Sequence, residues 1–512
     1  MENSKQYNAI YSCCISEPWL DVASKMKSEL NIHPAYFIGW KKDNSSEISK
    51  QHPNCFYQEV EDAWKGIGFP KLDYNFSFDE EIMKSIAYEK SIALKMMDRL
   101  DLGRNTFTYS NREIFFHRLL KYWMTITEYY QIDLIISPSI PHRVFDYVLY
   151  IVAKIKNIEI VMFQMSSFQD SSFLTNDIFN TPKYLKEYIQ NNNSKNEVLR
   201  ADIIEKLKQT TKDYSVAIPQ YMVKQQEDAD HNKFINRMKA RIKNLISNPL
   251  EQFEKDDTYY IMKSDDLPNK KDNIKLCRKI AKYRNAYYLK SLKKEYSTIS
   301  ITPDYQKPYL FIAFHYQPEE TSNPTGGIFE NQILIIELLN NFLDKKYQIY
   351  IKEHKTQFYP AFDGALSRNK NYYSSIAEIS DRIHFIDMKT SPFDLIDSAV
   401  ATVTISGTTG WESAIRGTPS LIFGRSWYED MPGVFKIKSV KDLEENWENI
   451  LALKNNILTN DIEEYHKKLQ HFFIEAPHYK FFQGRVDRTA EENCNNIFNG
   501  LKNHLERLKF FI

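Results

Sequence analysis

The sequence predicts an α/β protein with two doubly wound, Rossmann-like lobes, a helical insertion between them and helices at the C-terminus. Three observations lead to this fold class. The 512 residues exceed the ~100–200 residues of one ordinary domain. Short apolar runs alternate with helical patterns in residues 8–170 and again after residue 307. The stretch between these two parts is polar and rich in Lys, Asn and Glu.

The N-terminal lobe contains a clear strand–helix–strand unit. Residues 133–142 begin as a buried strand, residues 143–156 carry apolar side chains at helical spacing, and residues 158–165 form a second buried strand. Such a crossover joins parallel strands. Functional loops are therefore expected where these strands end, at residues 137–143 and 164–167.

The middle region has helical periodicity in residues 196–212, 229–247 and 269–296. Its Lys-rich part, Lys233 to Lys243, is interpreted as a solvated helix face, with a basic docking surface for lipid or a partner as the alternative. The expected regions are residues 1–170 for the N-terminal lobe, 171–304 for the insertion, 305–450 for the C-terminal lobe and 451–512 for helices that pack across both lobes.

The C-terminal lobe is predicted from a second α/β succession. Strands are expected at residues 309–315, 347–351, 382–386, 400–405 and 420–423, and helices at residues 328–343 and 409–416, with a short helix that starts at Ser391-Pro392. Gly417 and Pro419 are typical of a helix end. Parallel strands of this kind place their following loops at one edge of the sheet.

Composition excludes several classes of protein. Lys+Arg and Asp+Glu are both 67, so no net positive charge favours nucleic acid. The five cysteines are scattered without metal-ligand spacing, which indicates a reducing compartment and neither a disulfide framework nor a metal site. The N-terminal residues lack the pattern of a signal peptide, and no apolar run is long enough to span a bilayer. A cytoplasmic protein is expected.

The strongest local motif is Ser-Gly-Thr-Thr-Gly, which follows a predicted strand and opens a predicted helix. A helix N-terminus presents free N–H groups and a positive dipole end, so this loop is a candidate phosphate or carboxylate cradle. Glu412, one turn further on, could accept hydrogen bonds from a ribose. The alternative is a tight turn with Ser406 or Thr408 as a simple N-cap. The candidate loop residues are Ser406, Gly407, Thr408, Thr409 and Gly410.

Other candidate residues follow neighbouring strands. Lys352 and His354 come directly after residues 347–351 and could neutralise a leaving phosphate, although a solvated strand end is the alternative. A long polar loop starts at His315, which is a catalytic candidate together with Glu319. Glu319 or Glu320 could act as a base or hold a sugar hydroxyl. The alternative is a surface loop with a buried His315.

The acceptor side is expected in the N-terminal lobe. His142 and Arg143, with Asp146, mark the edge of this lobe that would face the C-terminal one. His142 could bind or activate an acceptor, and a role as helix cap is the alternative.

These residues resemble a known family. The runs HYQPEE, KEH and SGTTGWESAIRGTPSLIFGRSWY are similar to bacterial capsule and surface polysaccharide glycosyltransferases, a group similar to the capsule Kdo transferases. The resemblance covers about 130 residues of the C-terminal lobe, with support from the PH-x-x-x-DY region. It implies a GT-B fold with the nucleotide in the C-terminal lobe, Lys352 and His354 on the phosphate, and the motif from Ser406 to Thr409 as phosphate loop. Where the family often has proline after the histidine, this chain has Lys355.

The resemblance implies a transferase whose donor is a nucleotide sugar. No metal or other cofactor is expected, because helix N-termini and cationic side chains can neutralise a departing phosphate. A CMP-linked keto sugar acid such as CMP-Kdo is favoured and a UDP-sugar is the alternative. The acceptor is expected to be a surface saccharide or glycolipid, so peripheral contact with the inner face of the membrane is a further expectation. Two other functions stay open: a sugar-nucleotide 2-epimerase, and a noncatalytic protein of polysaccharide assembly.

Overall fold

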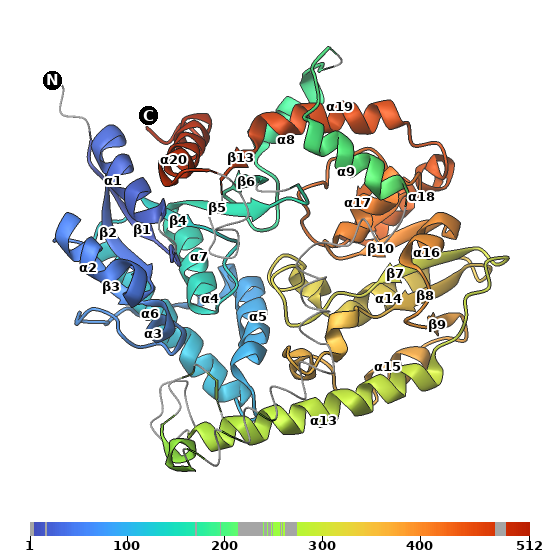
Figure 1. Ribbon diagram of the computed structural model, residues 1–512, viewed down its shortest axis with the longest axis horizontal. Coiled ribbons are helices and arrows are strands. Elements are labelled where there is room, and N and C mark those ends of the chain that lie inside the picture. The colour runs from blue at the N-terminus through green and yellow to red at the C-terminus, as the bar shows by residue number, and fades with distance from the viewer. Residues whose placement is uncertain are drawn as a thin grey trace.

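Two parallel sheets form the framework of the computed structural model (Figure 1). The structure describes residues 5–15, 18–168, 171–194, 196–212, scattered positions between 239 and 261, 274–476 and 488–511. The predicted class of two doubly wound lobes in a GT-B-like fold is confirmed. Most of the predicted helix at residues 229–247 lies outside the described residues.

The N-terminal sheet has the strand order β13-β6-β5-β4-β1-β2-β3. Its first five strands in sequence are parallel, β6 runs antiparallel to β5, and β13 runs antiparallel to β6. The strands are β1 (Tyr7–Tyr11), β2 (Ile32–Gly39), β3 (Phe56–Glu59), β4 (Leu134–Ser137), β5 (Glu159–Met165), β6 (Ser171–Thr175) and β13 (Ile474–Glu475). The region expected to be a helical insertion from residue 171 therefore starts with a strand of this sheet.

Helices cover both faces of the N-terminal sheet and bury two apolar cores. They are α1 (Pro18–Leu30), α2 (Lys41–Gln51), α3 (Val60–Trp64), α4 (Glu80–Ser85), α5 (Ala87–Met96), η1 (Met97–Leu100), α6 (Tyr109–Tyr129) and α7 (Phe145–Lys156). The predicted helix after β4 starts at Phe145 and not at Arg143, because residues 138–144 form the loop that follows the strand.

The C-terminal sheet is entirely parallel, in the order β12-β11-β10-β7-β8-β9. Numbered within the lobe, this is 6-5-4-1-2-3, the Rossmann order, whose order reverses between β7 and β10. The strands are β7 (Tyr309–Ala313), β8 (Gln348–Lys352), β9 (Ile383–Phe385), β10 (Ala401–Thr404), β11 (Ser420–Ile422) and β12 (Val434–Lys436). The predicted strands of this lobe are all present, with ends that differ by a few residues.

The helices of the C-terminal lobe enclose a core formed with the sheet. They are η3 (Gly327–Glu330), α14 (Gln332–Phe342), η4 (Lys355–Phe358), η5 (Gly364–Leu366), α15 (Tyr372–Ala377), α16 (Pro392–Ser398), α17 (Thr408–Ile415) and α18 (Val440–Leu453). The single helix predicted at residues 328–343 is divided in two, because the Asn331 side chain accepts a hydrogen bond from the N–H of Ile333 and caps α14.

Helix α13 (Lys275–Ile299) connects the two lobes along one side of the molecule (Figure 1). Leu289, Leu292 and Tyr296 of this helix lie in the C-terminal core. One turn nearer the N-terminus of the helix, Asn285 Nδ2 donates to the carbonyl oxygen of Leu102 at 3.1 Å, in the N-terminal lobe. The helix therefore holds a fixed contact with each lobe.

The remaining helices pack on different lobes. Helix α8 (Lys183–Asn191) contacts α19 (Thr459–Leu469), and α9 (Ala201–Lys212) contacts α17. The short turn η2 (Pro249–Phe253) contacts α13, and η6 (Gln470–Phe472) follows α19. Helix α20 (Ala490–Arg507) packs against α1 of the N-terminal lobe. Among the helices in the described part of the chain, none combines the length and apolar character needed to cross a bilayer.

Candidate functional site

The candidate site lies at the carboxyl edge of the C-terminal sheet, between β7 and β10. In an open parallel sheet, the point where strand order reverses leaves room for a ligand between two diverging loops. The loop after β7 carries His315 and the loop after β10 carries Ser406. Sequence reasoning placed both residues at strand ends, and the strand order brings the two loops together.

The Ser-Gly-Thr-Thr-Gly motif forms the entry to α17. Gly407 is the N-cap and makes no side-chain cap, so the alternative in which Ser406 or Thr408 serves as N-cap is wrong. Ser406 Oγ instead donates to the carbonyl oxygen of Thr321 at 2.6 Å. The backbone N–H groups of Thr408 and Thr409 have no acceptor among the residues that the structure describes. Two donors at the positive end of a helix are thus free to bind an anion.

The imidazole of His315 holds this loop in place. Its Nε2 accepts a hydrogen bond from the N–H of Ser406 at 3.2 Å and lies 2.9 Å from Thr404 Oγ1. The Thr404 hydroxyl accepts from the N–H of Gly407, which leaves its own proton for His315 Nε2. Burial lowers the pKa of His315 to about 3, so the ring is neutral, with its proton on Nδ1. His315 therefore positions the loop.

A short hydrogen-bond chain leads from His315 to a carboxyl group. Nδ1 lies 3.3 Å from Thr321 Oγ1, and this hydroxyl donates to Glu319 Oε2 at 2.8 Å. Burial raises the pKa of Glu319 above its ordinary value, the hydrogen bond from Thr321 opposes the rise, and the charge of Glu320 adds to it. A carboxyl with a raised pKa is suited to general acid–base chemistry.

The two lobes meet beside Glu319, at the neighbouring Glu320. His142 Nδ1, in the loop after β4, lies 3.1 Å from Glu320 Oε2, in the loop after β7. Arg99 of η1 donates to the carbonyl oxygens of His142 and of Asn323, the latter at 2.6 Å, and so touches both lobes. Sequence reasoning missed Arg99, because a lone arginine in an amphipathic segment carries no local signal of a distant contact. His142 does not cap α7, whose N-cap is Val144.

Lys352 occupies a different place from the one that the resemblance implies. Its ammonium donates to the carbonyl oxygens of Met388, at 3.0 Å, and Thr390, both in the loop after β9. Because β7 separates β8 from β10, this side chain is directed away from the Ser406 loop. Burial lowers the pKa of Lys352 to about 8, with a further contribution from Lys355.

His354 lies at the start of η4, where its Nδ1 accepts a hydrogen bond from the N–H of Thr356 at 3.2 Å. Burial lowers its pKa to about 4, with a smaller effect of Lys355. His354 follows β8, the strand that pairs with β7, and its ring lies 6.4 Å from that of Tyr316 in the loop after β7. His354 is therefore a neutral ring next to the loop after β7.

Glu353, between Lys352 and His354 in the sequence, anchors the edge of the sheet. Its Oε2 accepts from Arg368 Nε at 3.1 Å and from Tyr373 Oη at 2.9 Å. Arg368 also donates to the carbonyl oxygen of His315 at 3.1 Å. Both charged groups are fully buried, and each is satisfied by the other and by further hydrogen bonds. This pair fixes the loop after β7, and nothing in the local sequence indicated it.

Glu412 faces the insertion and is buried within α17. Burial raises its pKa to about 7, against the effects of a hydrogen bond with Thr408 and of the charges of Lys206 and Arg416. Lys206 belongs to α9, and Arg416 Nη1 donates to the carbonyl oxygen of Thr210 in the same helix, at 2.9 Å. Helix α9 thus covers the side of α17 where Glu412 lies.

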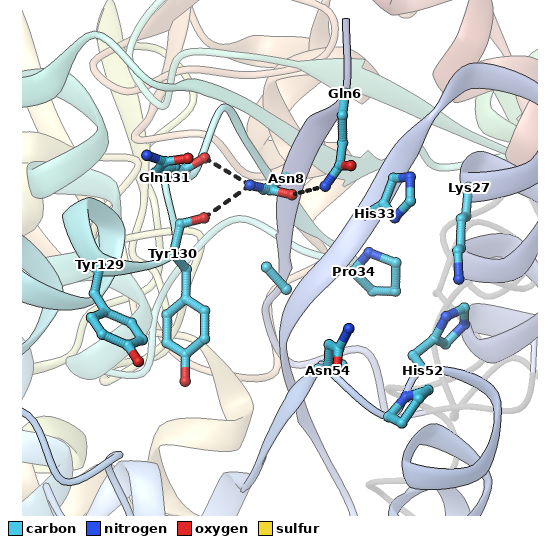
Figure 2. A pocket seen from close by; sticks show the side chains of 13 residues that line it. Gln6, Asn8, Lys27, His33, Pro34, His52, Asn54, Tyr129, Tyr130 and Gln131 are labelled. Carbon is cyan, nitrogen blue, oxygen red and sulfur yellow. Dashed lines mark hydrogen bonds between the residues drawn. The ribbon is translucent and has the colours of Figure 1, made fainter.

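A separate cavity of about 390 Å³ lies on the opposite edge of the N-terminal lobe, near the start of β1 and β2 (Figure 2). In this cavity, Asn8 accepts from Gln6 and donates to the carbonyl oxygens of Tyr130 and Gln131. Its lining contains none of the predicted site residues. The candidate site and this cavity are therefore distinct places in the molecule.

The fold and these loops define a class: a two-lobed α/β protein with a helix N-terminus at the switch point of a Rossmann-order sheet. Comparison adds no sequence family, since neither a family model nor a curated protein matches the chain.

Among solved structures, the chain is similar to a β-Kdo 2,7-transferase, KpsC of Thermosulfurimonas dismutans, with 15% identity over 43% of this chain and a TM-score of 0.24. The match spans 62% of the KpsC chain, less than two thirds of its length. A UDP-GlcNAc 2-epimerase of Methanocaldococcus jannaschii matches at 10% identity over 91% of this chain and 98% of its own, with a TM-score of 0.24. A glycosyltransferase of Rickettsia africae matches at 12% identity over 99% of both chains, with a TM-score of 0.23. At these values the comparisons carry no argument about activity.

Proposed function

We propose that the protein binds a nucleotide sugar at the N-terminus of α17 and transfers the sugar to a saccharide acceptor held by the N-terminal lobe. The observation that carries this proposal is the pair of free N–H groups of Thr408 and Thr409 at the switch point of the sheet. A phosphate there gains hydrogen bonds and the favourable end of the helix dipole, about 0.3–1 kcal/mol for the dipole alone.

The donor site in this proposal consists of the loop from Ser406 to Gly410, with Glu412 near the ribose. His354 follows β8, one strand further along the sheet than β7, and Lys352 is directed to the loop after β9. A leaving phosphate stabilised by preorganised backbone donors needs no metal ion in this proposal. A CMP-linked keto sugar acid is the favoured donor, and a UDP-sugar is the alternative.

The acceptor side in this proposal is the junction of His142, Glu320 and Glu319. The raised pKa of Glu319 suits a general base that takes the proton of an acceptor hydroxyl. His142 comes from the other lobe and reaches the same loop. An acceptor bound here would lie between a base on the C-terminal lobe and the loop after β4. The acceptor is proposed to be a surface polysaccharide or a lipid-linked saccharide. A cytoplasmic protein in peripheral contact with the inner face of the membrane is part of the same proposal.

One observation favours a second function, a sugar-nucleotide 2-epimerase. Glu319 and Glu412 both have raised pKa values near the same loops, and an epimerase needs acid and base groups but no acceptor. Incubation with UDP-GlcNAc and no acceptor separates the two functions. An epimeric nucleotide sugar seen by NMR would establish the epimerase, whereas slow release of free nucleotide would establish transfer to water.

The proposal is tested by thermal shift and calorimetry with CMP, UDP, GDP and dTDP. A specific nucleotide at a hundredfold excess over its Kd is expected to add about 2.7 kcal/mol to the free energy of unfolding. The double variant Ser406→Ala/Thr409→Pro is expected to weaken binding, because proline removes one of the two free donors while it is tolerated in the first turn of a helix. Unchanged affinity in that variant would show that the anion site lies elsewhere.

A further inference from the structure

Arg425 lies on the third loop of the same sheet edge, just after β11. The backbone N–H of Arg425 donates to the carbonyl oxygen of Thr325 at 3.1 Å, in the loop after β7. The neighbouring Gly424 packs so closely on Ile405, the residue before Ser406, that an added Cβ would lie 2.8 Å from the Ile405 side chain. Arg425 thus extends from the loop that borders the entry to α17.

The guanidinium of Arg425 is buried without a hydrogen-bond partner. The residue is 3% exposed, and its Nε and Nη1 have no acceptor, nor does the side chain bond to any residue in the described part of the chain. The other buried arginines of this lobe differ: Arg368 bonds to Glu353, and Arg382 bonds to Asn340 and to carbonyl oxygens. A buried charged donor without an acceptor costs several kcal/mol, so the orphan calls for an explanation.

The nearby carboxylates do not fill this need. Glu429 accepts hydrogen bonds from Thr181 and Lys436, at 2.5 and 2.7 Å. Asp177 accepts from the N–H groups of Phe179 and Asn180, at 2.6 and 2.9 Å. These two and Asp430, which lies 3.8 Å from Lys186 Nζ, act on Arg425 only through space, and burial lowers the pKa of Arg425 in spite of them.

The surroundings of Arg425 come from both lobes. Tyr150 of α7 and Asp177, which follows β6, interact electrostatically with it, and both belong to the N-terminal half of the chain. The guanidinium therefore lies at the junction where the loops after β7, β10 and β11 face the other lobe. A ligand bound at the α17 terminus and extending toward the N-terminal lobe would pass this point.

We propose that Arg425 binds an oxyanion of the donor, a phosphate or a sugar carboxylate, at the junction of the two lobes. The inference rests on the proposed function and adds the group of the donor that is recognised. A guanidinium presents paired N–H donors that match the two oxygens of either group. The orphaned donors of the ligand-free protein are then the partners of the ligand.

The test uses Arg425→Gln in the full chain, with pyrophosphate, CMP, UDP and CMP-N-acetylneuraminate as ligands. The variant is expected to bind at least one of these oxyanions roughly ten- to a hundredfold more weakly than the wild type, by calorimetry. Weaker binding of pyrophosphate, CMP and UDP would identify the phosphate as the partner. Weaker binding of CMP-N-acetylneuraminate alone would identify the sugar carboxylate.

Arg382→Gln is the matched control, since Arg382 is also buried in this lobe but precedes β9 at the amino edge and is fully bonded. Without ligand, Arg382→Gln is expected to melt below the wild type and to keep its affinity. Arg425→Gln is expected to melt at or above the wild type, because it removes a buried charge that has no partner. A lower melting temperature for Arg425→Gln would show that its guanidinium serves the fold.

Equal affinity of Arg425→Gln and the wild type for every ligand would overturn the inference, as would a wild type that binds none of them. Pyrophosphate binding that depends on Arg425, with no binding of any nucleotide, would retain the oxyanion site and refute the proposed function. Nucleotide binding that does not depend on Arg425 would retain the proposed function and refute the oxyanion site at Arg425.

Discussion

Glu412 combines burial in α17 with a place beside the candidate anion site. Its pKa is raised from 4.5 to about 7, so the folded protein holds this proton more tightly than the unfolded chain. The stability that comes from this proton is complete below about pH 4.5 and is lost as the pH rises through about 7. The whole effect is of order 3 kcal/mol.

Glu412→Gln is therefore expected to be more stable than the wild type at pH 8 by up to about 3 kcal/mol, and similar to it at pH 4.5. Urea unfolding at both pH values measures this difference. Glu448→Gln, an exposed change on α18, serves as control and should leave the difference between the two pH values as in the wild type. A Glu412→Gln variant that tracks the wild type at both values would mean that the carboxyl is ionised when folded.

Single residues also show where sequence reasoning ends. The motif at Ser406 and the polar loop at His315 were found because each follows a strand that is visible in the sequence. The direction of the Lys352 side chain was not found, since it depends on which strand lies next to β8. Arg99 and Arg425 were missed for a related reason: their meaning comes from the other lobe, and a single sequence does not show contacts between distant segments.

At the scale of elements, α17 depends on how it ends as much as on how it begins. Gly417 follows the helix with φ +83°, a conformation that favours glycine, and its N–H bonds to the carbonyl oxygen of Ala414. An added Cβ meets only Asn455 at an ordinary 3.7 Å, so the cost of a side chain there is conformational and not steric.

Gly417→Ala is expected to lower the free energy of unfolding by about 1–2 kcal/mol. Gly417→Asn should cost less and Gly417→Val more, because asparagine tolerates this backbone region and β-branched residues do not. Chemical denaturation of the three variants measures the series. Three equal losses would indicate that the side chain meets an obstacle, in place of the backbone preference.

Element prediction was most accurate where strands are short, apolar and followed by turn residues, as in β7 to β11. It was least accurate at β6 and β13. The polar stretch after residue 170 gave no sign of a strand, and a two-residue strand has no periodicity to detect. β6 folds back on the adjacent β5, whereas β13 pairs with β6 across about 300 residues of chain, a contact that no local pattern determines.

At the scale of the whole molecule, several histidines are buried in the neutral form. Burial lowers the pKa of His315 and His504 to about 3, and that of His354 and His466 to about 4. Each takes up a proton only on unfolding, so its contribution to stability is complete above the unfolded pKa of about 6.5 and is lost as the pH falls below it.

The free energy of unfolding is therefore expected to fall by about 1.4 kcal/mol per pH unit for each such histidine between pH 6.5 and about 4. Glu412 acts in the opposite direction: its carboxyl binds a proton more tightly in the folded protein, so its contribution to the free energy of unfolding rises as the pH falls. Urea unfolding at pH 7.5, 6.5 and 5.5 measures the slope. His466→Phe should reduce the slope by the share of one histidine, about 1.4 kcal/mol per pH unit. A free energy of unfolding that stays constant down to pH 5 would contradict the conclusion that these histidines are neutral in the folded protein.

The C-terminal helix α20 belongs to the N-terminal lobe. Ile497, Phe498, Leu501 and Leu505 are buried in the same core as Trp19 and Val22 of α1. Leu501→Ala is expected to cost about 2–5 kcal/mol, whereas the exposed Asn503→Ala should cost less than about 0.5 kcal/mol. Hydrogen exchange should show the loss of protection in α1 and β1, with β7 and β10 unaffected. Equal loss in both lobes would show that they unfold as one unit.

The position of α20 also bears on the order of synthesis. A ribosome releases β1 and α1 before the second lobe, yet the helix that shields α1 and the edge strand β13 are translated after that lobe. The strands of the second lobe, in contrast, are contiguous in the chain. The N-terminal lobe is therefore completed only after the second lobe has been made, and until then the apolar face around Trp19 lacks its cover from α20.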